Sequence, residues 1–389
     1  MTLYIDPPLT PGHGTYWSHL ISDEAFDELH RFARQRGLPP RGFDRDHYDV
    51  PEQMYAHVVA AGATPVSARH ITTLLIRSGL RRRKAQVLAP GRPGQRLVQP
   101  RHLRPGDVVA VVHPAGPVSP ERLAPGVEVL QRWGLRVSVP AARDPGPLPW
   151  LAADDAARAE EFMTAWLDRE VQALWAARGG FGSQRLLDLL DWQALRDAPP
   201  VWFIGFSDVT ALHQAIAQQL GLASVHGPGV AGLAEADDAT RESARSLLMH
   251  TARQRFTGRP GGGGRAEGVL VGGNLTMLAA LAGSSYGHPA RDSIAVLEDV
   301  GEQPYRLDRA LTQLAACGWL TGVRGIALGQ FVNCGDPALV RRLLERRLAD
   351  LGVPVVYDIP FGHGTTNVAL PLGRRARLDA DLGTVELLG

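Results

Sequence analysis

The chain contains very little lysine or cysteine. Lys84 is the only lysine among 389 residues, and it lies in a basic stretch. A Schiff-base lysine, a Ser–Lys dyad or a Walker-type phosphate lysine would have to be this residue, so we exclude all three. The two cysteines, Cys317 and Cys334, make no disulfide framework, and neither has a partner at metal-ligand spacing.

Long apolar runs and an excess of one charge are also absent. No apolar run approaches the length of a membrane span. The formal net charge is +1, with 44% hydrophobic and 21% charged residues, which argues against attraction to nucleic acid or an anionic membrane. The opening M-T-L-Y-I-D-P-P lacks the basic and apolar regions of a secretory signal. These features predict a cytoplasmic globular protein of two or three domains.

Residues 1–78 are expected to form a small α/β domain. Residues 3–6 have the pattern of a strand, and helical patterns cover 23–36 and 67–76, the latter with Ser67 as a plausible N-cap. Polar side chains are dense here, and one hypothesis is a hydrolytic or divalent-metal site. Its members would be Asp6, His19, Asp23, His47 and Asp49. We favour the alternative, surface or hydrogen-bonded core residues, because no pair has a recognised ligand spacing.

Two segments have the composition of linkers. Residues 79–103 are rich in arginine and proline and contain no acid, and they lack the interleaved aromatics of a single-strand nucleic-acid site. Residues 236–266 begin with acidic residues that lead a helix and end in a glycine run at 261–264. No Gly-Lys-Ser/Thr follows that run, so it is not a phosphate loop. We predict a flexible linker there.

Between these segments, residues 104–235 alternate short apolar runs with helical patterns. This alternation predicts a parallel-sheet, Rossmann-like α/β domain, in which ligands gather at the carboxyl ends of strands. Three turns follow such strands: 113–116, 178–182 and 205–208. Residues 267–389 are predicted to be a second α/β domain with a β-rich end.

The third turn carries Ser207 between an apolar strand and a helical pattern. A serine there either caps the helix or serves as a nucleophile, because helix N-termini favour developing negative charge. A nucleophile needs a base and a group that orients the base. Glu298 at a strand end and His363 between two glycines suit these roles, although each taken alone is also an ordinary strand-end acid or loop histidine.

The motifs in combination resemble the LD-carboxypeptidase family of serine peptidases, which includes muramoyl-tetrapeptide carboxypeptidases and microcin C immunity peptidases. The resemblance covers about residues 103–389. It rests on R-G-G-F-G at 178–182, G-F-S-D-V-T-A-L at 205–212, G-G-N-L at 272–275, L-E-D-V-G-E-x-P-Y-R-L-D-R at 297–309 and G-H-G at 362–364.

The N-terminal region, in turn, resembles a small bacterial domain of unknown function. The matching residues are Tyr4-Ile5-Asp6, Trp17-Ser18-His19-Leu20, Glu28-Leu29-His30 and His47-Tyr48-Asp49. This second resemblance supplies a domain boundary and no mechanism.

The family resemblance implies a catalytic triad with Ser207 as nucleophile, His363 as general base and Glu298 as the residue that orients His363. It further implies an oxyanion hole made by the backbone N–H of Asp208 and of a glycine, Gly180 or its neighbour Gly179. Val209 stands where the α/β-hydrolase elbow G-x-S-x-G has its second glycine, which argues against an esterase or lipase.

The resemblance also implies a cofactor-free homodimer that cleaves the L,D amide bond of cytoplasmic muropeptides in peptidoglycan recycling. Residues 104–235 and 267–389 contain no metal motif, which predicts that chelators leave this activity unchanged. An alternative within the same chemistry is a microcin C-type peptide–nucleotide hydrolase. A third alternative, from a different class, is a non-catalytic peptide-binding scaffold. Asn274, Glu302 and Arg306 are candidate substrate-binding residues, since an arginine fork suits a peptide carboxylate, but each could equally be a structural ion pair or cap.

Overall fold

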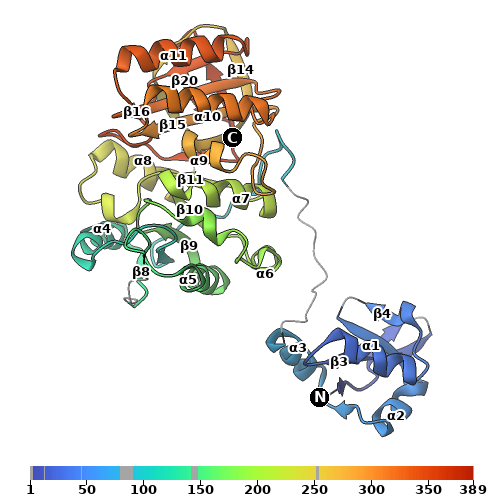
Figure 1. Ribbon diagram of the computed structural model, residues 1–389. Helices are drawn as coiled ribbons and strands as arrows, with labels where there is room; N and C mark the ends of the chain where they lie inside the picture. The colour runs from blue at the N-terminus through green and yellow to red at the C-terminus, as the bar shows by residue number, and fades with distance from the viewer. Residues whose placement is uncertain are drawn as a thin grey trace. The chain divides into compact units, whose positions relative to one another are not determined.

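Three β-sheets organise the chain in this computed structural model (Figure 1). The structure describes residues 3–12, 14–44, 46–78, 91–141, 148–250 and 254–388. The chain divides into two compact units, Met1–Ala85 and Gln86–Gly389. Within the described ranges, no helix combines the length and the apolar character needed to cross a bilayer.

The smaller unit is a mixed sheet with helices on both faces. Its strand order is β4-β5-β3-β1-β6, with β2 beside β3. Leu20 and Val50 on one face pack against Leu29 of the first helix, and Ile21 on the other face packs against the last helix. The elements are β1 (Leu3–Ile5), β2 (Thr10–Gly12), β3 (Thr15–Ser22), α1 (Phe26–Gln35), β4 (Phe43–Asp44), β5 (His47–Pro51), α2 (Glu52–Ala60), β6 (Thr64–Pro65) and α3 (Ala68–Arg77).

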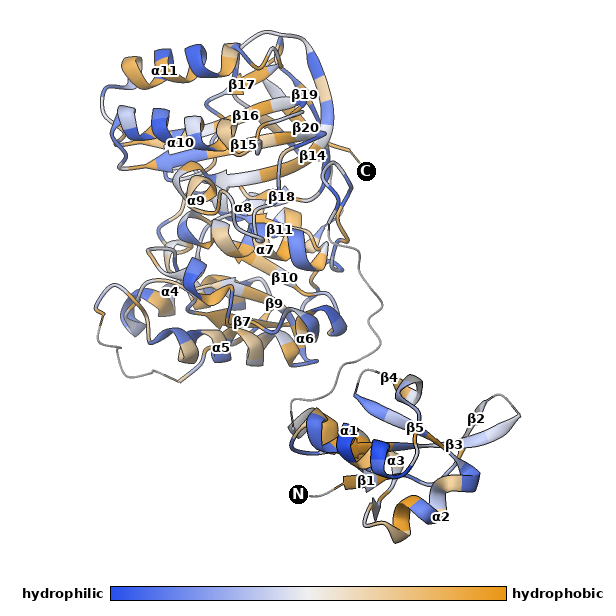
Figure 2. Ribbon diagram, turned by 45° about the vertical axis from the view of Figure 1, so that its right-hand side comes forward, coloured by the Kyte–Doolittle hydropathy of each residue, from blue (hydrophilic) through white to orange (hydrophobic). Residues whose placement is uncertain are grey.

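The first sheet of the larger unit has the order β18-β11-β10-β9-β7-β8 and is parallel except for β18. Val109 faces a core shared with α4, whereas Ala110 faces a core shared with α5, so helices cover both faces. Figure 2 shows β9 and β10 as apolar strands among helices of mixed character. The elements are β7 (Val108–Val112), α4 (Pro120–Arg132), β8 (Arg136–Ser138), α5 (Asp155–Leu167), β9 (Val171–Ala176), α6 (Trp192–Asp197), β10 (Trp202–Gly205), α7 (Thr210–Leu220), β11 (Ser224–His226), α8 (Asp238–Met249) and β18 (Leu370–Leu372).

The second sheet has the order β12-β20-β19-β14-β15-β16-β17-β13. Its four central strands, β14 to β17, are parallel and its outer strands are antiparallel, which is the β-rich end expected from the sequence. The predicted α/β fold class is therefore confirmed. The elements are β12 (Arg255–Thr257), β13 (Arg259–Pro260), β14 (Arg265–Asn274), α9 (Leu275–Ala280), β15 (Ser293–Val300), α10 (Pro304–Ala316), β16 (Gly325–Val332), α11 (Pro337–Ala349), β17 (Val355–Tyr357), β19 (Arg375–Asp379) and β20 (Thr384–Leu387).

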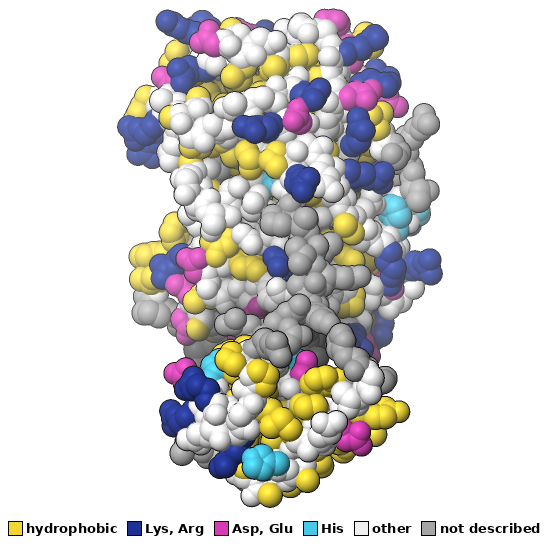
Figure 3. Space-filling model, turned by 90° about the vertical axis from the view of Figure 1, so that its right-hand side faces the viewer, with side chains coloured by type: hydrophobic (Ala, Val, Ile, Leu, Met, Phe, Trp, Pro, Cys, Tyr) yellow, Lys and Arg dark blue, Asp and Glu magenta, His cyan; other side chains and the backbone are white. Residues whose placement is uncertain are grey.

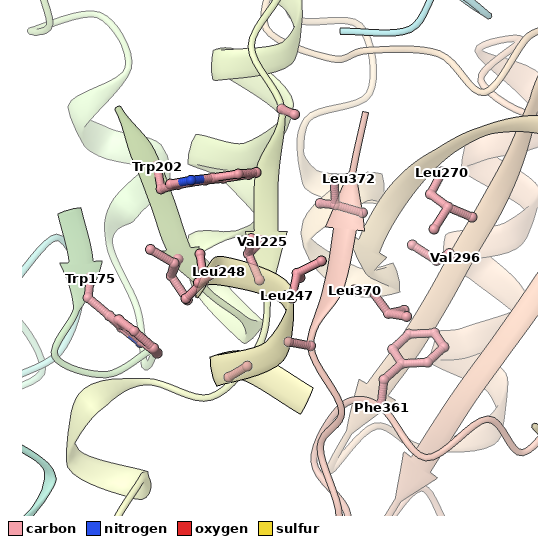
Figure 4. Close-up of a cluster of buried hydrophobic side chains, with 14 of the residues drawn as sticks. Trp175, Trp202, Val225, Leu247, Leu248, Leu270, Val296, Phe361, Leu370 and Leu372 are labelled. Atoms are coloured by element: carbon pink, nitrogen blue, oxygen red, sulfur yellow. The ribbon is translucent and has the colours of Figure 1, made fainter. Parts of the chain in front are cut away.

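A continuous core joins the two sheets of the larger unit. Trp175 and Trp202 of the first sheet belong to the same buried cluster as Leu270 and Val296 of the second (Figure 4). The strand β18, which comes late in the chain, pairs with β11 of the first sheet. The residues on the two sheets are therefore held by shared packing and not only by the chain between them.

The structure differs from the prediction in both segments that were expected to be linkers. Residues 79–90, which include Lys84, lie outside the described residues. Residues 91–103 pack onto the larger unit: Leu97 N donates to Gly373 O over 3.0 Å, and Leu97 and Leu103 are buried. The apolar side chains in this basic stretch explain why it docks.

The predicted flexible linker at 236–266 is wrong in its described part. This segment contains α8, with Leu247 and Leu248 in the core, and the strands β12 and β13, which pair with β20 and β17 (Figure 4). A Cβ at Gly258 or Gly261 would meet the backbone of β17. These two glycines therefore permit close packing of two strands and do not act as a hinge.

Charged side chains are spread over the surface of the larger unit. On the face shown in Figure 3, arginines lie among acidic and neutral side chains. Several are paired, such as Arg265 with Asp379 at 2.6 Å and Arg324 with Asp292 at 2.6 Å. This arrangement agrees with the near-zero net charge of the chain.

Candidate active site

The turn after β10 holds Ser207 in a strained conformation. Ser207 has a φ of 66°, in the left-handed region that L-residues with a side chain rarely adopt. A 3₁₀ turn, Ser207–Val209, then leads directly into α7. A Cβ at Gly205 would lie 2.7 Å from Val209 Cγ2, so only glycine fits before the turn. A strained serine at a strand-to-helix turn is the geometry of a nucleophile elbow.

The glycine turn at 178–182 lies against Ser207, and a second glycine turn, 113–116, lies against the first. A Cβ at Gly179 would lie 2.9 Å from Ser207 Cβ and 3.2 Å from its Oγ. Gly179 O accepts a hydrogen bond from Gly116 N at 3.2 Å, so the turn after β7 is attached to the same place. Gly180 has a φ of 121°, a conformation that favours glycine. The turn at 178–182 is thus in contact with each of the other two turns that follow strands.

Asp208 fixes the loop at 178–182 to the serine turn. Its buried carboxylate accepts hydrogen bonds from Gly182 N at 3.2 Å and Ser183 N at 2.8 Å. Ser183 Oγ in turn donates to Asp208 O at 2.6 Å. Within the described ranges Gly180 N–H has no recorded acceptor. The assignment of the backbone N–H groups of Asp208 and Gly180 to an oxyanion hole stays a prediction.

Glu298 and His363 form a direct pair. His363 Nδ1 lies 2.7 Å from Glu298 Oε2, and Glu298 is completely buried in β15. Burial raises the pKa of Glu298, whereas the hydrogen bond to His363 opposes that rise. A Cβ at Gly362 would lie 2.6 Å from Glu298 Oε2, so the glycine lets the loop approach the carboxylate. With Nδ1 held, Nε2 is the ring nitrogen left for proton transfer.

The Glu298–His363 pair lies beside the serine turn. The ring of His363 packs on that of Phe206, with 4.8 Å between centroids, and Phe206 immediately precedes Ser207. Among the residues described, Ser207 Oγ and His363 share no hydrogen bond within 3.5 Å. Catalytic hydrogen bonds are often long in the absence of substrate. The assignment of all three residues as a triad stays a prediction.

Two buried histidines that the sequence analysis did not assign lie behind this turn. His213 Nε2 is 2.8 Å from Gly205 O, and its Nδ1 is 2.8 Å from Ser224 Oγ. Burial lowers the pKa of His213 to about 4, so the ring is neutral at pH 7. Since a carbonyl only accepts, Nε2 carries the proton and Nδ1 accepts from Ser224. His213 therefore holds the residue two before Ser207.

The second of these histidines, His226, ends β11. It is fully buried, and neither ring nitrogen has a hydrogen-bond partner in the described part of the chain. Its ring lies 6.0 Å from that of Phe206 and 5.6 Å from that of Phe361. Burial, and then the nearby His213 and His363, lower its pKa well below 6.5. Its position at the end of an apolar run and before a glycine is the sequence pattern from which it could have been identified.

The predicted substrate-binding residues have intramolecular partners. Asn274 Oδ1 accepts from Met277 N at 3.1 Å, and its Nδ2 donates to Asp299 Oδ1 at 3.0 Å. Arg306 forms an ion pair with Glu302 at 3.6 Å. The recorded contacts of these residues do not include Ser207 or His363, so their role in substrate binding stays a prediction.

A cavity of about 610 Å³ adjoins the turn at 113–116. Apolar side chains of α4 line it, including Leu123 and Val127, together with the buried side chains of Arg158 and Glu161. Glu161 Oε1 accepts a hydrogen bond from His113 N at 2.6 Å. Ser207 and His363 do not line this cavity, so we do not assign it to the reaction.

In the smaller unit, the structure brings together three of the five residues proposed for a metal or hydrolytic site. Ligand atoms of His19, His47 and Asp49 lie within 4.8 Å of one another, and Asp6 binds His19. Asp23 is not in this group and accepts a hydrogen bond from Tyr4 at 3.3 Å. Burial lowers the pKa of His47, but its hydrogen bonds to Asp46 and Asp49 outweigh that and raise it to about 9.

Three family models match most of the chain. The LD-carboxypeptidase N-terminal domain matches residues 109–227, and the LD-carboxypeptidase C-terminal domain matches residues 267–378. Residues 3–78 match a protein of unknown function, DUF4031.

Individual proteins match over the larger unit. A putative carboxypeptidase of Streptomyces coelicolor is 47% identical over 75% of this chain and 96% of its own length. A murein tetrapeptide carboxypeptidase of Pseudomonas aeruginosa is 36% identical over 60% of this chain and 80% of its own. The microcin C7 self-immunity protein MccF, solved with aspartyl sulfamoyl adenosine, shares the fold at 24% identity, with a TM-score of 0.67 over 75% of this chain and 98% of its own.

Proposed function

This chain belongs to the LD-carboxypeptidase family and is a serine-type carboxypeptidase, and we propose that it removes D-alanine from muropeptides with Ser207, His363 and Glu298 as its triad. The observation that carries the proposal is the strained Ser207 beside the Glu298–His363 pair. A left-handed serine costs about 1–2 kcal/mol, which a capping role does not require.

In the first half of the proposed reaction, Ser207 Oγ attacks the carbonyl carbon of the L,D amide while His363 Nε2 takes the hydroxyl proton. The N–H groups of Asp208 and Gly180 bind the tetrahedral oxyanion. The C–N bond then breaks, and His363 gives its proton to the departing D-alanine amine. An acyl ester on Ser207 remains.

In the second half, water attacks the acyl ester and His363 takes a proton from that water. The ester bond breaks, Ser207 recovers its proton from His363, and the tripeptide leaves as a carboxylic acid. Glu298 stays ionised beside the imidazolium that forms in each half and holds the ring in one tautomer. Its burial makes this role strong, because a charge pair in a low-dielectric site is little screened.

The muropeptide substrate is supported by the Pseudomonas aeruginosa relative, whose name specifies murein tetrapeptide. The same support leads us to propose a cytoplasmic enzyme in peptidoglycan recycling. We further propose a homodimer, as the family resemblance implies. Arg306, 55% exposed at the start of α10, is the proposed contact for the terminal carboxylate of the peptide.

A microcin C-type hydrolase is the second candidate, and one feature of α10 favours it. Tyr305 is 57% exposed, and the guanidinium groups of Arg306 and Arg309 lie 5.9 and 5.5 Å from its ring centre. An exposed aromatic next to two cations suits a nucleobase with an anionic linker. The shared fold with MccF is compatible with this function.

A comparison of two substrates tests the proposal. The wild type is given muramoyl tetrapeptide and aspartyl sulfamoyl adenosine in separate assays, and kcat/KM is measured for each. We expect D-alanine release to be at least 100-fold more efficient. A preference for the nucleotide conjugate would instead select the second candidate, and Tyr305→Ala should then weaken its binding. Activity on neither would remove both substrates and favour the non-catalytic scaffold.

A further inference from the structure

The smaller unit carries a cluster of histidines and carboxylates on one face of its sheet. The strands β1, β3 and β5 are neighbours, and His19 lies directly opposite Asp49 in the β3–β5 register. Asp6 follows β1, and its N–H donates to His19 O. Strand pairing therefore aligns residues that are far apart in the sequence.

Alternation along the strands separates this cluster from the hydrophobic core. Leu20, Tyr48 and Val50 point into the core on one face of the sheet. His19, His47 and Asp49 occupy the alternate positions and so point to the opposite face. The same face is covered at another place by α3, which packs on Ile21. The cluster is thus on a supported surface and not on a loose loop.

A buried carboxylate holds each imidazole through Nδ1. Asp6 Oδ2 lies 2.9 Å from His19 Nδ1, and Asp46 Oδ1 lies 2.6 Å from His47 Nδ1. The two acids are only 4% and 8% exposed, whereas the two histidines are 28% and 20% exposed. Carboxylates that orient imidazoles in this way are the usual outer support of metal-binding histidines.

Ligand atoms of the two histidines and of Asp49 lie close together. Both Nδ1 atoms are bonded to carboxylates, and His47 Nε2 lies 3.2 Å from Asp49 Oδ1. The ligand atoms of His19, His47 and Asp49 are all within 4.8 Å of one another. Metal–ligand bonds of about 2.0–2.2 Å bring ligand atoms to roughly 3–4 Å separation, which small side-chain rotations would achieve here.

We propose that the smaller unit binds one divalent transition-metal ion through His19, His47 and Asp49, with Asp6 and Asp46 as positioning residues. Two imidazoles and one carboxylate suit Zn²⁺ and its neighbours better than Ca²⁺ or Mg²⁺, which prefer oxygen ligands. Asp49 is 42% exposed, so a fourth coordination position can open to water or to an oxygen-bearing ligand.

The rival explanation is an ion-pair network that needs only protons. Both explanations account for short histidine–carboxylate distances. They differ in whether they account for the position of His19. A proton on His47 is already satisfied by Asp46 and Asp49, so an ion-pair network does not explain why a ligand atom of His19 lies within 4.8 Å of those of His47 and Asp49. The convergence of three ligand atoms therefore favours a metal ion.

Metal titration of the full-length protein tests the proposal. Chelator-treated protein is titrated with Co²⁺, followed by its visible absorption, and with Zn²⁺, followed by calorimetry. We expect one tight equivalent in the wild type. His47→Gln and Asp49→Asn should weaken it at least 100-fold, and Asp46→Asn by about 10–100-fold. His57→Gln, on the exposed side of α2, is the matched control and should bind like the wild type.

The folded state is monitored independently by near-UV circular dichroism. Asp49→Asn nearly preserves shape at a partly exposed position, so its fold is expected to survive even if that of His47→Gln does not. Absence of a tight equivalent in the wild type would overturn the proposal. Equal binding by the wild type and folded Asp49→Asn would overturn it as well, by assigning the ion to other residues.

Discussion

Both units of the chain contain a histidine whose Nδ1 is held by a buried carboxylate, yet the two arrangements suit different chemistry. In the larger unit, the pair of Glu298 and His363 lies beside a strained serine turn. In the smaller unit, two such pairs converge with a third carboxylate. The carboxylate orients the imidazole ring in both cases. The groups near the other ring nitrogen determine whether the histidine is suited to proton transfer or to metal binding.

The buried histidines of the two units also differ in their pKa values. Behind the serine turn, burial without nearby carboxylates keeps His213 and His226 neutral, with lowered pKa values. In the smaller unit, two carboxylates raise the pKa of His47 to about 9 despite its burial. The histidines behind the serine turn are therefore neutral, whereas the carboxylates around the histidines of the smaller unit attract a cation.

The largest expected effect comes from removing the proposed base. His363→Ala should lower kcat for D-alanine release by at least about 10⁴-fold, because Ser207 then has no proton acceptor. The metal affinity of the smaller unit should not change. His250→Ala, at an exposed position after α8, is the control and should keep full activity. Substantial turnover by His363→Ala would show that another group is the base.

A carboxylate-to-amide substitution in the larger unit should affect only catalysis, and the same substitution in the smaller unit should affect only metal binding. Glu298→Gln should lower kcat by about 10³–10⁴-fold, because the amide no longer fixes the tautomer or stabilises the imidazolium. Its KM should change little, and its pH profile should shift. Asp46→Asn should weaken metal binding and leave D-alanine release intact. If each substitution affected both activities, the two pairs would not be independent.

Acid should destabilise the larger unit through its buried histidines. His213 has a folded-state pKa of about 4 and an unfolded value near 6.5, so only the unfolded chain gains a proton between these values. The stabilisation is therefore complete above pH 6.5 and is lost as pH falls toward 4. We expect a loss of about 2 kcal/mol between pH 7 and pH 5 from this residue.

Urea unfolding of the wild type and His213→Gln at pH 7 and pH 5 measures the loss of stability that is due to His213. The variant should lose less stability on acidification than the wild type, whatever its stability at pH 7. Equal losses in the two proteins would mean that His213 is protonated in the folded state.

Relief of strain at Ser207 should give a smaller change. Glycine adopts a φ of 66° without the Cβ clash that alanine meets, so Ser207→Gly should be more stable than Ser207→Ala by about 1 kcal/mol. Both variants should be inactive. Thermal unfolding compares them directly, and an equally stable alanine variant would argue that this turn relaxes when the hydroxyl is lost.

The smallest expected effect is that of a chelator on catalysis. Ser207, His363 and Glu298 need no metal for the proposed reaction, so EDTA should leave D-alanine release unchanged while it removes the ion from the smaller unit. Loss of activity that Zn²⁺ restores would contradict the separation of the two sites.

Much of the larger unit could be predicted from the sequence. The strands at 108–112 and 171–176 are among the short apolar runs of the sequence, because buried parallel strands are continuous apolar runs. The sequence places glycines near Ser207 and on both sides of His363, and the structure shows close backbone approach at Gly179 and Gly362. Family membership rested on these same motifs.

Long-range pairing could not be predicted. The three residues of β18 carry no periodic signal, and their place beside β11 follows from packing between the two sheets. The glycines at 258 and 261 have the composition of a linker, although they serve tight contact between strands. In the smaller unit, the pairing of β3 with β5 brings His19 opposite Asp49, and the spacing of these residues in the sequence does not predict that pairing.

D-Alanine release from muramoyl tetrapeptide by the wild type and Ser207→Ala, at equal concentrations of folded protein, tests the central claim most directly. The account predicts release by the wild type and a decrease of at least about 10⁴-fold in the variant. Release by Ser207→Ala at a rate near that of the wild type would contradict the assignment of Ser207 as the nucleophile.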